Sequence, residues 1–290
     1  MKSRMGRRNP VERENARRER LDNDWQIMYK SFMQKLLFAV ALLSPSILLG
    51  QNPFDGTWKT IFDQSTLSPK PISFSVRKGI YDAFTAVPEI HVKADGQDQA
   101  VSGHPYNTVA VTEMDAHNVQ IVYKKDGKTI RELTYTVTAD GKTLTYKSKS
   151  HAPGSDQITT TEATMERVGE APTGANASSG SWRSQKRSAS ANELLATYMR
   201  SADELTFSKP AGEAWTARLD GKDYPVKGSY SIDAVSLKQI NGHEIEVSYK
   251  REGKLTEVDK ITISTNGRKM TRVVESKLTG RVSIYVAEKQ

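Results

Sequence analysis

An all-β fold of two tandem antiparallel meander barrels, with eight to ten strands in each, is predicted from three features of the sequence. The chain contains two copies of one unit, at a spacing of 124 to 126 residues. Within each copy, apolar residues alternate with polar ones, which is typical of strands with one buried face. Pairs such as Asp126-Gly127 and Asn266-Gly267 separate the alternating runs and favour tight hairpins.

The repeat sets the expected domain boundaries. Gly56-Thr57-Trp58-Lys59 recurs as Gly180-Ser181-Trp182-Arg183, and the run from Val119 to Lys128 recurs from Ile245 to Lys254. We therefore expect one barrel over residues 53–168 and a second over residues 180–290. Residues 169–179 contain no large apolar side chain, so we expect a flexible linker there.

One segment fits two patterns. Leu194, Leu195, Tyr198 and Met199 have the spacing of a helix face, but their counterparts in the first copy, Ile72, Phe74 and Val76, alternate cleanly. We predict a strand in both copies, with a short helix in the second copy as the alternative. No long helical segment separates the strands, so the sheets are expected to be antiparallel.

A secretory signal is predicted at residues 33–50. Met33-Gln34-Lys35 precedes eight apolar residues, 36–43, and then come Pro45 and a small residue, Gly50. This run is shorter than the roughly 20 apolar residues that a membrane helix needs. We expect cleavage and an extracytoplasmic location, periplasmic or secreted, with no stable membrane span in the mature protein.

Residues 1–32 have no place in such a signal. They hold nine Lys or Arg and five Asp or Glu. We interpret them as a mis-assigned start or a disordered basic extension, with the true start at Met33. If they are translated, their charge would favour a signal anchor in the inner membrane instead.

Composition excludes several classes of function. The chain has no cysteine, which excludes disulfides, thiolate metal sites and a cysteine nucleophile. Its net charge is +8, but residues 51–290 carry only +3, so we expect no nucleic-acid partner. The five histidines show no metal-binding spacing, and no phosphate-binding loop or nucleophile elbow is present. We expect no metal, no cofactor and no enzyme activity.

Gly56-Thr57-Trp58 and Gly180-Ser181-Trp182 resemble the Gly, any residue, Trp signature at the first strand of lipocalins and related calycin barrels. The run from Leu219 to Gly228, with Leu278 to Arg281, also resembles uncharacterised exported bacterial proteins described as lipocalin-like. The resemblance implies barrels closed at one end by Trp58 and Trp182. It assigns no functional site, because that second group has none to carry over.

Candidate ligand contacts are few. Tyr123 and Tyr249 close matched strands, where a phenol facing the interior could orient a ligand; the alternative is an ordinary core aromatic with its hydroxyl at the rim. Gly56, Trp58, Gly180 and Trp182 are interpreted as structural. Carboxylate pairs such as Asp95 with Asp98 surround glycine turns and are expected to form those turns.

Two functions from different classes stay open. The first is a non-enzymatic exported protein that holds a small apolar or amphipathic ligand in a lipocalin-like barrel. The second is a structural or protein-interaction module of the bacterial cell envelope, with filled barrels and exposed strand edges. A solidly packed interior would count against a ligand inside the barrel.

Overall fold

The computed structural model describes residues 52–154 and 156–290, whose regular secondary structure is almost entirely β-strand. The strands up to residue 168 are β1 Gly56–Thr60, β2 Ile72–Arg77, β3 Ile80–Ala83, β4 Ile90–Lys93, β5 Asp95–Ala100, β6 Thr108–Glu113, β7 Asn118–Lys125, β8 Lys128–Val137, β9 Thr143–His151 and β10 Ile158–Val168. Those that follow are β11 Gly180–Ala189, β12 Leu195–Ser201, β13 Glu204–Ser208, β14 Ala214–Arg218, β15 Tyr224–Lys227, β16 Ala234–Asn241, β17 Glu244–Arg251, β18 Lys254–Ile263, β19 Lys269–Ser276 and β20 Val282–Lys289. The short helices are η1 Phe62–Gln64 and α2 Ala191–Leu194.

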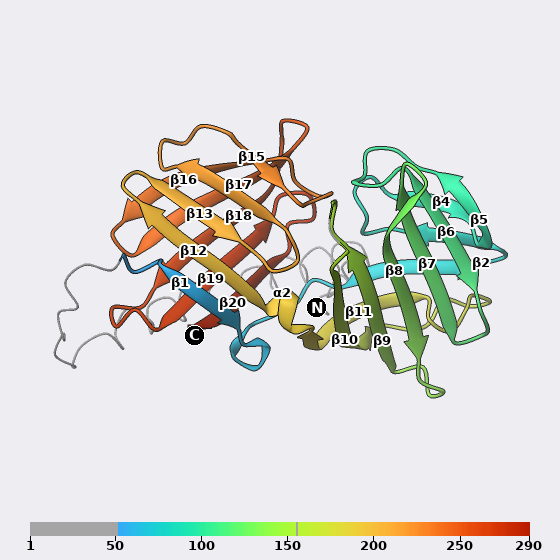
Figure 1. Ribbon diagram of the computed structural model, residues 1–290. Helices are drawn as coiled ribbons and strands as arrows, with labels where there is room; N and C mark the ends of the chain where they lie inside the picture. The colour runs from blue at the N-terminus through green and yellow to red at the C-terminus, as the bar shows by residue number, and fades with distance from the viewer. Residues whose placement is uncertain (1–51, 155) are drawn as a thin grey trace, which may run out of the picture. The chain divides into compact units, whose positions relative to one another are not determined.

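These strands form two ten-stranded antiparallel sheets (Figure 1). One is a closed barrel of β1 and β12 to β20, in which every strand has two neighbours. The other runs in the order β4-β3-β2-β11-β10-β9-β8-β7-β6-β5, so that β4 and β5 are its edge strands, each with one hydrogen-bonded neighbour among the described strands; we call it the open barrel. The all-β prediction and the antiparallel prediction are confirmed.

The first strands of the two repeats are exchanged, and here the structure departs from the boundaries 53–168 and 180–290. β1 lies between β12 and β20, with Trp58 opposite Ala196 and Lys289. β11 lies between β10 and β2, with Trp182 opposite Ile72 and Arg167. In Figure 1, blue β1 lies among orange and red strands. The exchange is possible because the repeats present equivalent edges to either first strand.

The equivalence of those edges extends to side chains. In the closed barrel the Thr57 and Thr197 hydroxyls are 2.9 Å apart, and in the open barrel the Ser181 and Ser73 hydroxyls are 2.7 Å apart. Both pairs join an exchanged strand to its new neighbour. A first strand therefore finds the same partner chemistry in either barrel.

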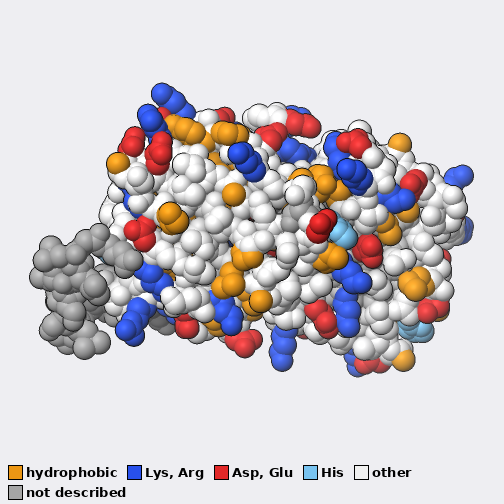
Figure 2. Space-filling view, viewed as in Figure 1, with side chains coloured by type: hydrophobic (Ala, Val, Ile, Leu, Met, Phe, Trp, Pro, Cys, Tyr) orange, Lys and Arg blue, Asp and Glu red, His pale blue; other side chains and the backbone are white. Residues whose placement is uncertain are grey.

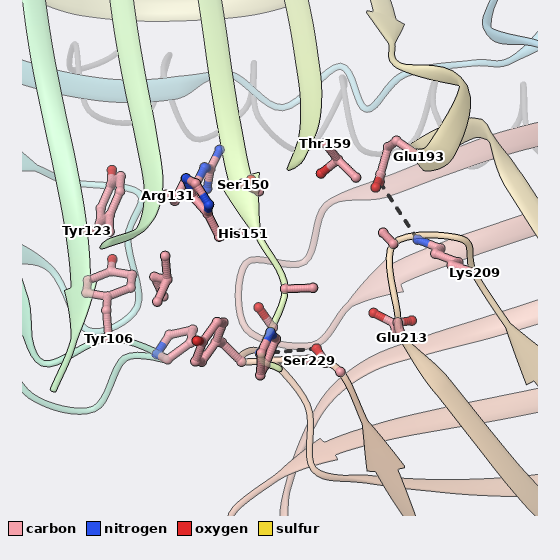
Figure 3. A pocket seen from close by; sticks show the side chains of 18 residues that line it. Tyr106, Tyr123, Arg131, Ser150, His151, Thr159, Glu193, Lys209, Glu213 and Ser229 are labelled. Atoms are coloured by element: carbon pink, nitrogen blue, oxygen red, sulfur yellow. Dashed lines mark hydrogen bonds and ion pairs between the residues drawn. The ribbon is translucent and has the colours of Figure 1, made fainter. Parts of the chain in front are cut away.

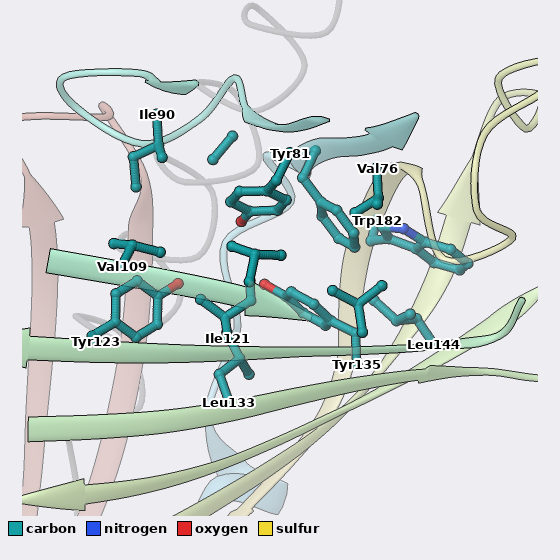
Figure 4. Packing of buried hydrophobic residues seen from close by; sticks show 14 of the residues in the cluster. Val76, Tyr81, Ile90, Val109, Ile121, Tyr123, Leu133, Tyr135, Leu144 and Trp182 are labelled. Carbon is teal, nitrogen blue, oxygen red and sulfur yellow. The ribbon is translucent and has the colours of Figure 1, made fainter. Parts of the chain in front are cut away.

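Apolar side chains fill the centre of each barrel. Figure 4 shows the core of the open barrel, where Val76, Ile121, Leu144 and Trp182 are all fully buried. The core of the closed barrel contains the following buried residues: Phe54, Trp58, Ala196, Tyr198, Leu205, Phe207, Trp215, Ala217, Val235, Leu237, Ile245, Val247, Tyr249, Ile261, Ile263, Met270 and Ala287. Burial of this apolar area, in the absence of disulfides, is the main source of stability.

Residues 175–179 depart from the expected flexible linker. The Asn176 amide N–H donates to the Val76 carbonyl at 2.8 Å, and the Ala177 N–H donates to the Ala116 carbonyl at 3.0 Å. Ser178 and Ser179 are fully buried. Because its side chains are small, this segment packs closely against the end of the open barrel. A composition that is typical of flexible linkers here belongs to a packed segment.

The ambiguous segment contains both predicted elements. α2 ends at Leu194, and β12 begins at Leu195, so that Tyr198 points into the closed barrel while Met199 faces solvent. The expected signal at 33–50 and the extension at 1–32 lie outside the described residues. Within the described part of the chain, no helix is long and apolar enough to cross a membrane.

Candidate functional site

The two candidate tyrosines have different surroundings. Tyr123, on β7, lines a surface cleft near one end of the open barrel. Tyr249, its counterpart on β17, is buried inside the closed barrel, where Asp259, Tyr198 and Arg272 act on it electrostatically. Both phenols are therefore buried in a core, and of the two only Tyr123 borders the cleft.

Arg131 lies between aromatic rings in this cleft. Its guanidinium carbon is 5.7 Å from the centroid of the Tyr123 ring and 5.6 Å from that of Tyr146, within cation–π range. Its Nε donates to the Ser148 hydroxyl at 3.0 Å, and its Nη2 donates to the Tyr146 hydroxyl. Within residues 52–154 and 156–290, no carboxylate forms an ion pair with it. The positive charge is thus held in place without being neutralised.

Tyr106 lies beside Tyr123 on the same side of the cleft, and we call these two rings the aromatic wall. Its ring centroid is 4.7 Å from that of Tyr123 and 4.9 Å from the His104 ring, which stacks on it. Burial raises the pKa of Tyr106 and of Tyr123. Both phenols therefore keep their protons at neutral pH and act as apolar surfaces and hydrogen-bond donors.

Local hydrogen bonds hold the loop that carries Tyr106. The Asn107 side chain donates to the Asp126 carboxylate at 2.8 Å and accepts from the Asp126 amide at 3.0 Å, which ties the loop to the β7–β8 turn. Arg251 Nη2 donates to the Gly103 carbonyl at 2.7 Å. In the second repeat Asp233 accepts from the Glu252 amide at 2.7 Å, a related clamp. The aromatic wall is thus anchored on both sides.

The opposite side of the cleft comes from the closed barrel. Figure 3 shows Tyr106, Tyr123 and Arg131 on one side, with Lys209 and Glu213 on the other. Lys209 lies 3.8 Å from the Glu193 carboxylate, whereas Glu213 forms no ion pair within the described residues. The cleft has a volume of about 240 Å³. It therefore offers one cation, one carboxylate and several rings to a small molecule.

A second hollow, of about 330 Å³, lies where residues 174–177 cross the other end of the open barrel. Its central polar side chain, Asn176, donates to Glu113 Oε1 at 2.9 Å and to the Asp115 carbonyl at 2.7 Å. These bonds satisfy the Asn176 amide within the chain. The first cleft is the better candidate, because its unpaired Arg131 lies against aromatic rings, whereas no aromatic residue of the described part of the chain lines the second hollow.

A buried ionic cluster lies inside the closed barrel. Asp259 is fully buried, and its Oδ2 accepts from Arg272 Nε at 3.1 Å and from Arg272 Nη2. Asp259 Oδ1 and the Tyr198 hydroxyl have no hydrogen-bond partner within the described residues. Burial, together with the Asp259 charge, raises the pKa of neighbouring Glu257 to about 7. The interior of the closed barrel thus contains a small ionic cluster beside its apolar side chains.

The matched tryptophans occupy matched sites. The Trp58 indole N–H donates to the Phe54 carbonyl at 2.9 Å, and that of Trp182 donates to the Ser178 carbonyl at 2.8 Å. A cation covers each ring: Lys289 at 5.5 Å from the Trp58 centroid and Arg167 at 4.1 Å from the Trp182 centroid. Gly56 and Gly180 precede them with φ of 122° and 130°. None of these four residues lines the cleft.

The remaining candidates act in turns. The backbone amides of His117 and His243 donate to Asp115 and Asn241 at 2.7 and 2.9 Å. Asp95 and Asp220 accept from backbone amides two residues on, at 3.0 Å each. Asp98 and Asp223 form ion pairs with Lys124 and Lys250 at 2.8 and 2.6 Å. Within the described residues, no group of three or more potential ligands could hold a metal.

Charge is mixed on the one face of the molecule that the space-filling view displays (Figure 2). On the face in Figure 2, Lys and Arg side chains alternate with Asp and Glu side chains and form no continuous basic stripe. Such a stripe is the usual footprint of a phosphate-backbone partner.

Comparisons with known proteins add no family. No protein-family model matches the chain, and no curated protein matches it. The crystal structure of BamB from Moraxella catarrhalis aligns over 80% of this chain and 98% of that chain, with 8% sequence identity and a TM-score of 0.14. A likeness at that level carries no conclusion about fold or function.

Proposed function

We propose that this protein is an extracytoplasmic, non-enzymatic binding protein that takes a small amphipathic anion in the cleft beside Tyr106, Tyr123 and Arg131. The observation that carries the proposal is the Arg131 guanidinium, which is fixed by Ser148 and Tyr146 but has no carboxylate partner in the described residues. Its remaining N–H donors suit a carboxylate, which arginine binds in a bidentate manner.

The rings beside Arg131 supply the apolar half of the interaction. The Tyr123 ring is almost wholly buried, and Tyr106 packs against it at the cleft wall. Most small-molecule sites combine aromatic surface with a few placed polar groups. A ligand with a carboxylate and a short apolar body matches this arrangement.

The proposal places the ligand outside the barrel interior. Val109, Val111, Val119 and Ile121 of the open barrel are fully buried among other side chains, so they fill the space that a hollow lipocalin-like barrel uses. Clefts for drug-sized ligands have volumes of roughly 300–1,000 Å³. A cleft of about 240 Å³ therefore favours a smaller ligand.

Sequence supports the finer parts of the proposal. The Gly, any residue, Trp motifs at Gly56 and Gly180 support a lipocalin-like origin of both barrels. The apolar run at 36–43 supports export, and a mature mass beginning near Gln51 is expected for the secreted protein. A secreted protein that retains residues 1–32 would overturn the export route.

The binding test compares a carboxylate with its neutral isostere. Titration of the full chain with 3-phenylpropionate and with 3-phenylpropanamide, followed by calorimetry or ligand-observed NMR, is expected to show about tenfold tighter binding of the carboxylate. Arg131→Gln should remove this preference. Arg218→Gln, at an exposed arginine on β14 that pairs with Glu204, is the matched control and should keep it. Equal binding of the two probes to the native chain contradicts the proposal.

One observation favours a second candidate, a protein-interaction module. β4 and β5 are the edge strands of the open barrel in the described part of the chain, and Phe84 and Val87, in the loop before β4, are 51% and 43% exposed. A free edge can pair with a strand of another protein. A photo-crosslinking residue at Phe84 is expected to capture a discrete envelope protein if this candidate holds, whereas one at exposed Met199 is not. No adduct at Phe84 rejects it.

A further inference from the structure

Outside the cleft, two partly exposed arginines have hydrogen-bond donors that the chain does not use. Arg187 lies on β11, and Arg281 lies directly before β20. Within the described residues, Arg187 Nε and Arg281 Nη1 are buried atoms without a hydrogen-bond partner. An unpaired buried donor on a charged group is costly. Both side chains therefore favour an acceptor from outside the chain.

Tyr285, on β20, is the residue that both arginines share. Arg187 Nη1 donates to the Tyr285 hydroxyl at 3.3 Å. The Arg281 carbonyl accepts from the Ser276 amide at 2.9 Å, which extends the β19–β20 pairing by one residue. Arg281 and Tyr285 are four residues apart on this extended strand, so they lie on the same face of it. Arg281 also interacts electrostatically with Tyr285. Both arginines therefore belong to the surroundings of one phenol.

A ring of η1 also holds Arg187. The Arg187 guanidinium carbon is 5.4 Å from the centroid of the Phe62 ring, within cation–π range. The Phe62 and Tyr285 rings meet edge to face, with centroids 6.2 Å apart and an angle of 71° between their planes. Two aromatic residues thus position the Arg187 guanidinium, and neither of them carries a carboxylate.

No carboxylate of the surrounding elements pairs with the two arginines within the described residues. Glu166, on β10, forms its ion pair with Arg183 at 3.3 Å. Glu288, near the end of β20, accepts from the Gln64 side chain at 3.1 Å. Asp63, on η1, is exposed and forms no ion pair in the described part of the chain. The two positive charges are therefore not balanced there.

Lys70 adds a third positive charge beside Arg281. It lies in the connection between β1 and β2, and its Nζ is 3.0 Å from the position that a Cβ on Gly280 would take. Burial lowers the pKa of Arg281, and the group that opposes this shift within the described residues is Tyr285, not a carboxylate. A cluster of cations without carboxylates attracts an anion from solution.

We propose that Arg187, Arg281 and Tyr285 bind an oxyanion of the phosphate class; we call these three residues the arginine site. A phosphate monoester carries nearly two negative charges and several acceptor oxygens at neutral pH, which matches two guanidinium groups. The Tyr285 hydroxyl accepts from Arg187 and can donate its own hydrogen to the same oxyanion. A carboxylate would balance only one of the two charges.

The arginine site is separate from the cleft. None of its three residues lines the cleft beside Arg131. The inference therefore goes beyond the proposed function and does not rest on it. Variants of the arginine site should bind 3-phenylpropionate as the native chain does, so the failure of one proposal is distinguishable from the failure of the other.

The test is calorimetric titration of the full chain with sodium phosphate, at an ionic strength held constant with sodium chloride. Arg187→Gln and Arg281→Gln should each weaken phosphate binding about tenfold. Arg187→Lys keeps the charge but not the planar fork, and should weaken binding less. Lys186→Gln, at an exposed lysine on the opposite face of β11, is the matched control and should bind phosphate like the native chain.

Two sources of a phosphate group are distinguished with vesicles of phosphatidylcholine, prepared with and without phosphatidic acid. Binding of free phosphate assigns a soluble ligand. Binding only to the vesicles that contain phosphatidic acid, lost in both Arg187→Gln and Arg281→Gln, assigns a lipid headgroup. Binding to neither probe overturns the inference.

Two further results would contradict a shared site. The first is a loss in Lys186→Gln as large as the loss in the arginine variants, which would indicate general attraction between charges. The second is a loss in only one of Arg187→Gln and Arg281→Gln. Thermal unfolding in chloride alone checks that each variant is folded, and Arg281→Lys replaces Arg281→Gln if that variant is not.

Discussion

Trp58 and Trp182 hold equivalent positions in the two repeats, yet each is buried in the barrel that the other's repeat mostly builds. Each indole N–H donates to a carbonyl four residues earlier in the chain, at 2.9 and 2.8 Å. Each tryptophan therefore has the same local hydrogen bond in its own strand. The two tryptophans differ in the sheet that their strands join.

Substitution of these tryptophans tests the exchange. Trp58→Ala should cost about 3–5 kcal/mol of stability, as for other buried aromatics, and should speed hydrogen exchange in β12 to β20 of the closed barrel. Trp182→Ala should speed exchange in β2 to β10 of the open barrel. Hydrogen exchange read by mass spectrometry separates these regions. If each substitution instead loosens its own repeat, the exchanged topology is wrong.

Gly180→Ala should destabilise the open barrel. Gly180 has a φ of 130°, and a Cβ placed there would lie 2.5 Å from Arg167 Nη1. That guanidinium covers Trp182 and donates to the Ser179 and Ala177 carbonyls, so its displacement removes several contacts at once. We expect a loss of about 1–3 kcal/mol from backbone strain, with further loss from the displaced arginine.

The matched control for that substitution is Gly79→Ala in the same barrel. Gly79 also has a positive φ, 72°, but no atom of the described residues lies within 4 Å of its added Cβ. Its cost should be about 1 kcal/mol. Equal losses for the two variants in urea denaturation would mean that the Arg167 arrangement contributes nothing.

The Asp259–Arg272 pair should be replaceable only as a unit. Register places Leu133 and Tyr146 of the open barrel at the positions that Asp259 and Arg272 hold in the closed barrel. Asp259→Leu alone leaves the mostly buried Arg272 guanidinium without its carboxylate and should cost about 3–5 kcal/mol. The double variant Asp259→Leu, Arg272→Tyr should recover that loss in thermal unfolding. A double variant as unstable as the single one contradicts this expectation.

Glu257 should make the closed barrel lose stability as the pH rises. Burial, together with the Asp259 charge, raises the pKa of this carboxyl from 4.5 to about 7 in the folded state. Between these values the folded chain binds a proton that the unfolded chain has released, so its contribution is complete below about pH 4.5 and is lost by about pH 7. The slope is at most about 1.4 kcal/mol per pH unit. Comparison of unfolding free energies for the native chain and Glu257→Gln across this range isolates the effect, and parallel curves would refute it.

The strands, and the side chains that face the core, were predictable from sequence, because the alternation of apolar and polar residues is a local property. Val119, Ile121 and Tyr123 were assigned to one face of a strand, and all three are buried in the core. Leu133 and Tyr135 follow the same rule on β8. The hairpin at Asp126-Gly127 was also predictable, since both residues adopt the positive φ that its turn requires.

The exchange of first strands was not predictable from the repeat. Thr57 and Ser181 find equivalent hydroxyl partners, Thr197 and Ser73, in the barrels that receive them. Each first strand therefore fits both edges almost equally well by local chemistry. The choice depends on how the connections after β1 and after β11 are routed, which alternation does not encode.

Only some of the residues that line the cleft could be identified from the sequence. Arg131 occupies an inward position by the same alternation that places Leu133 and Tyr135, and a charged residue at an inward position is a signal of function that the pattern contains. Glu213 carries no such signal. It lies in a turn, and it lines the same cleft as Arg131 because segments that are far apart in the sequence pack together there.

The routing of the chain also determines which pieces of it are complete. The open barrel is built from one uninterrupted stretch, β2 to β11, which enters between the first and second strands of the closed barrel as an insertion. A gene fragment that spans this stretch encodes every strand of the open barrel. The closed barrel is instead split between the two flanks of the insertion. Loss of the short amino-terminal flank removes β1. β12 and β20 then each lack one neighbouring strand, and no other strand in the described part of the chain fills the gap between them.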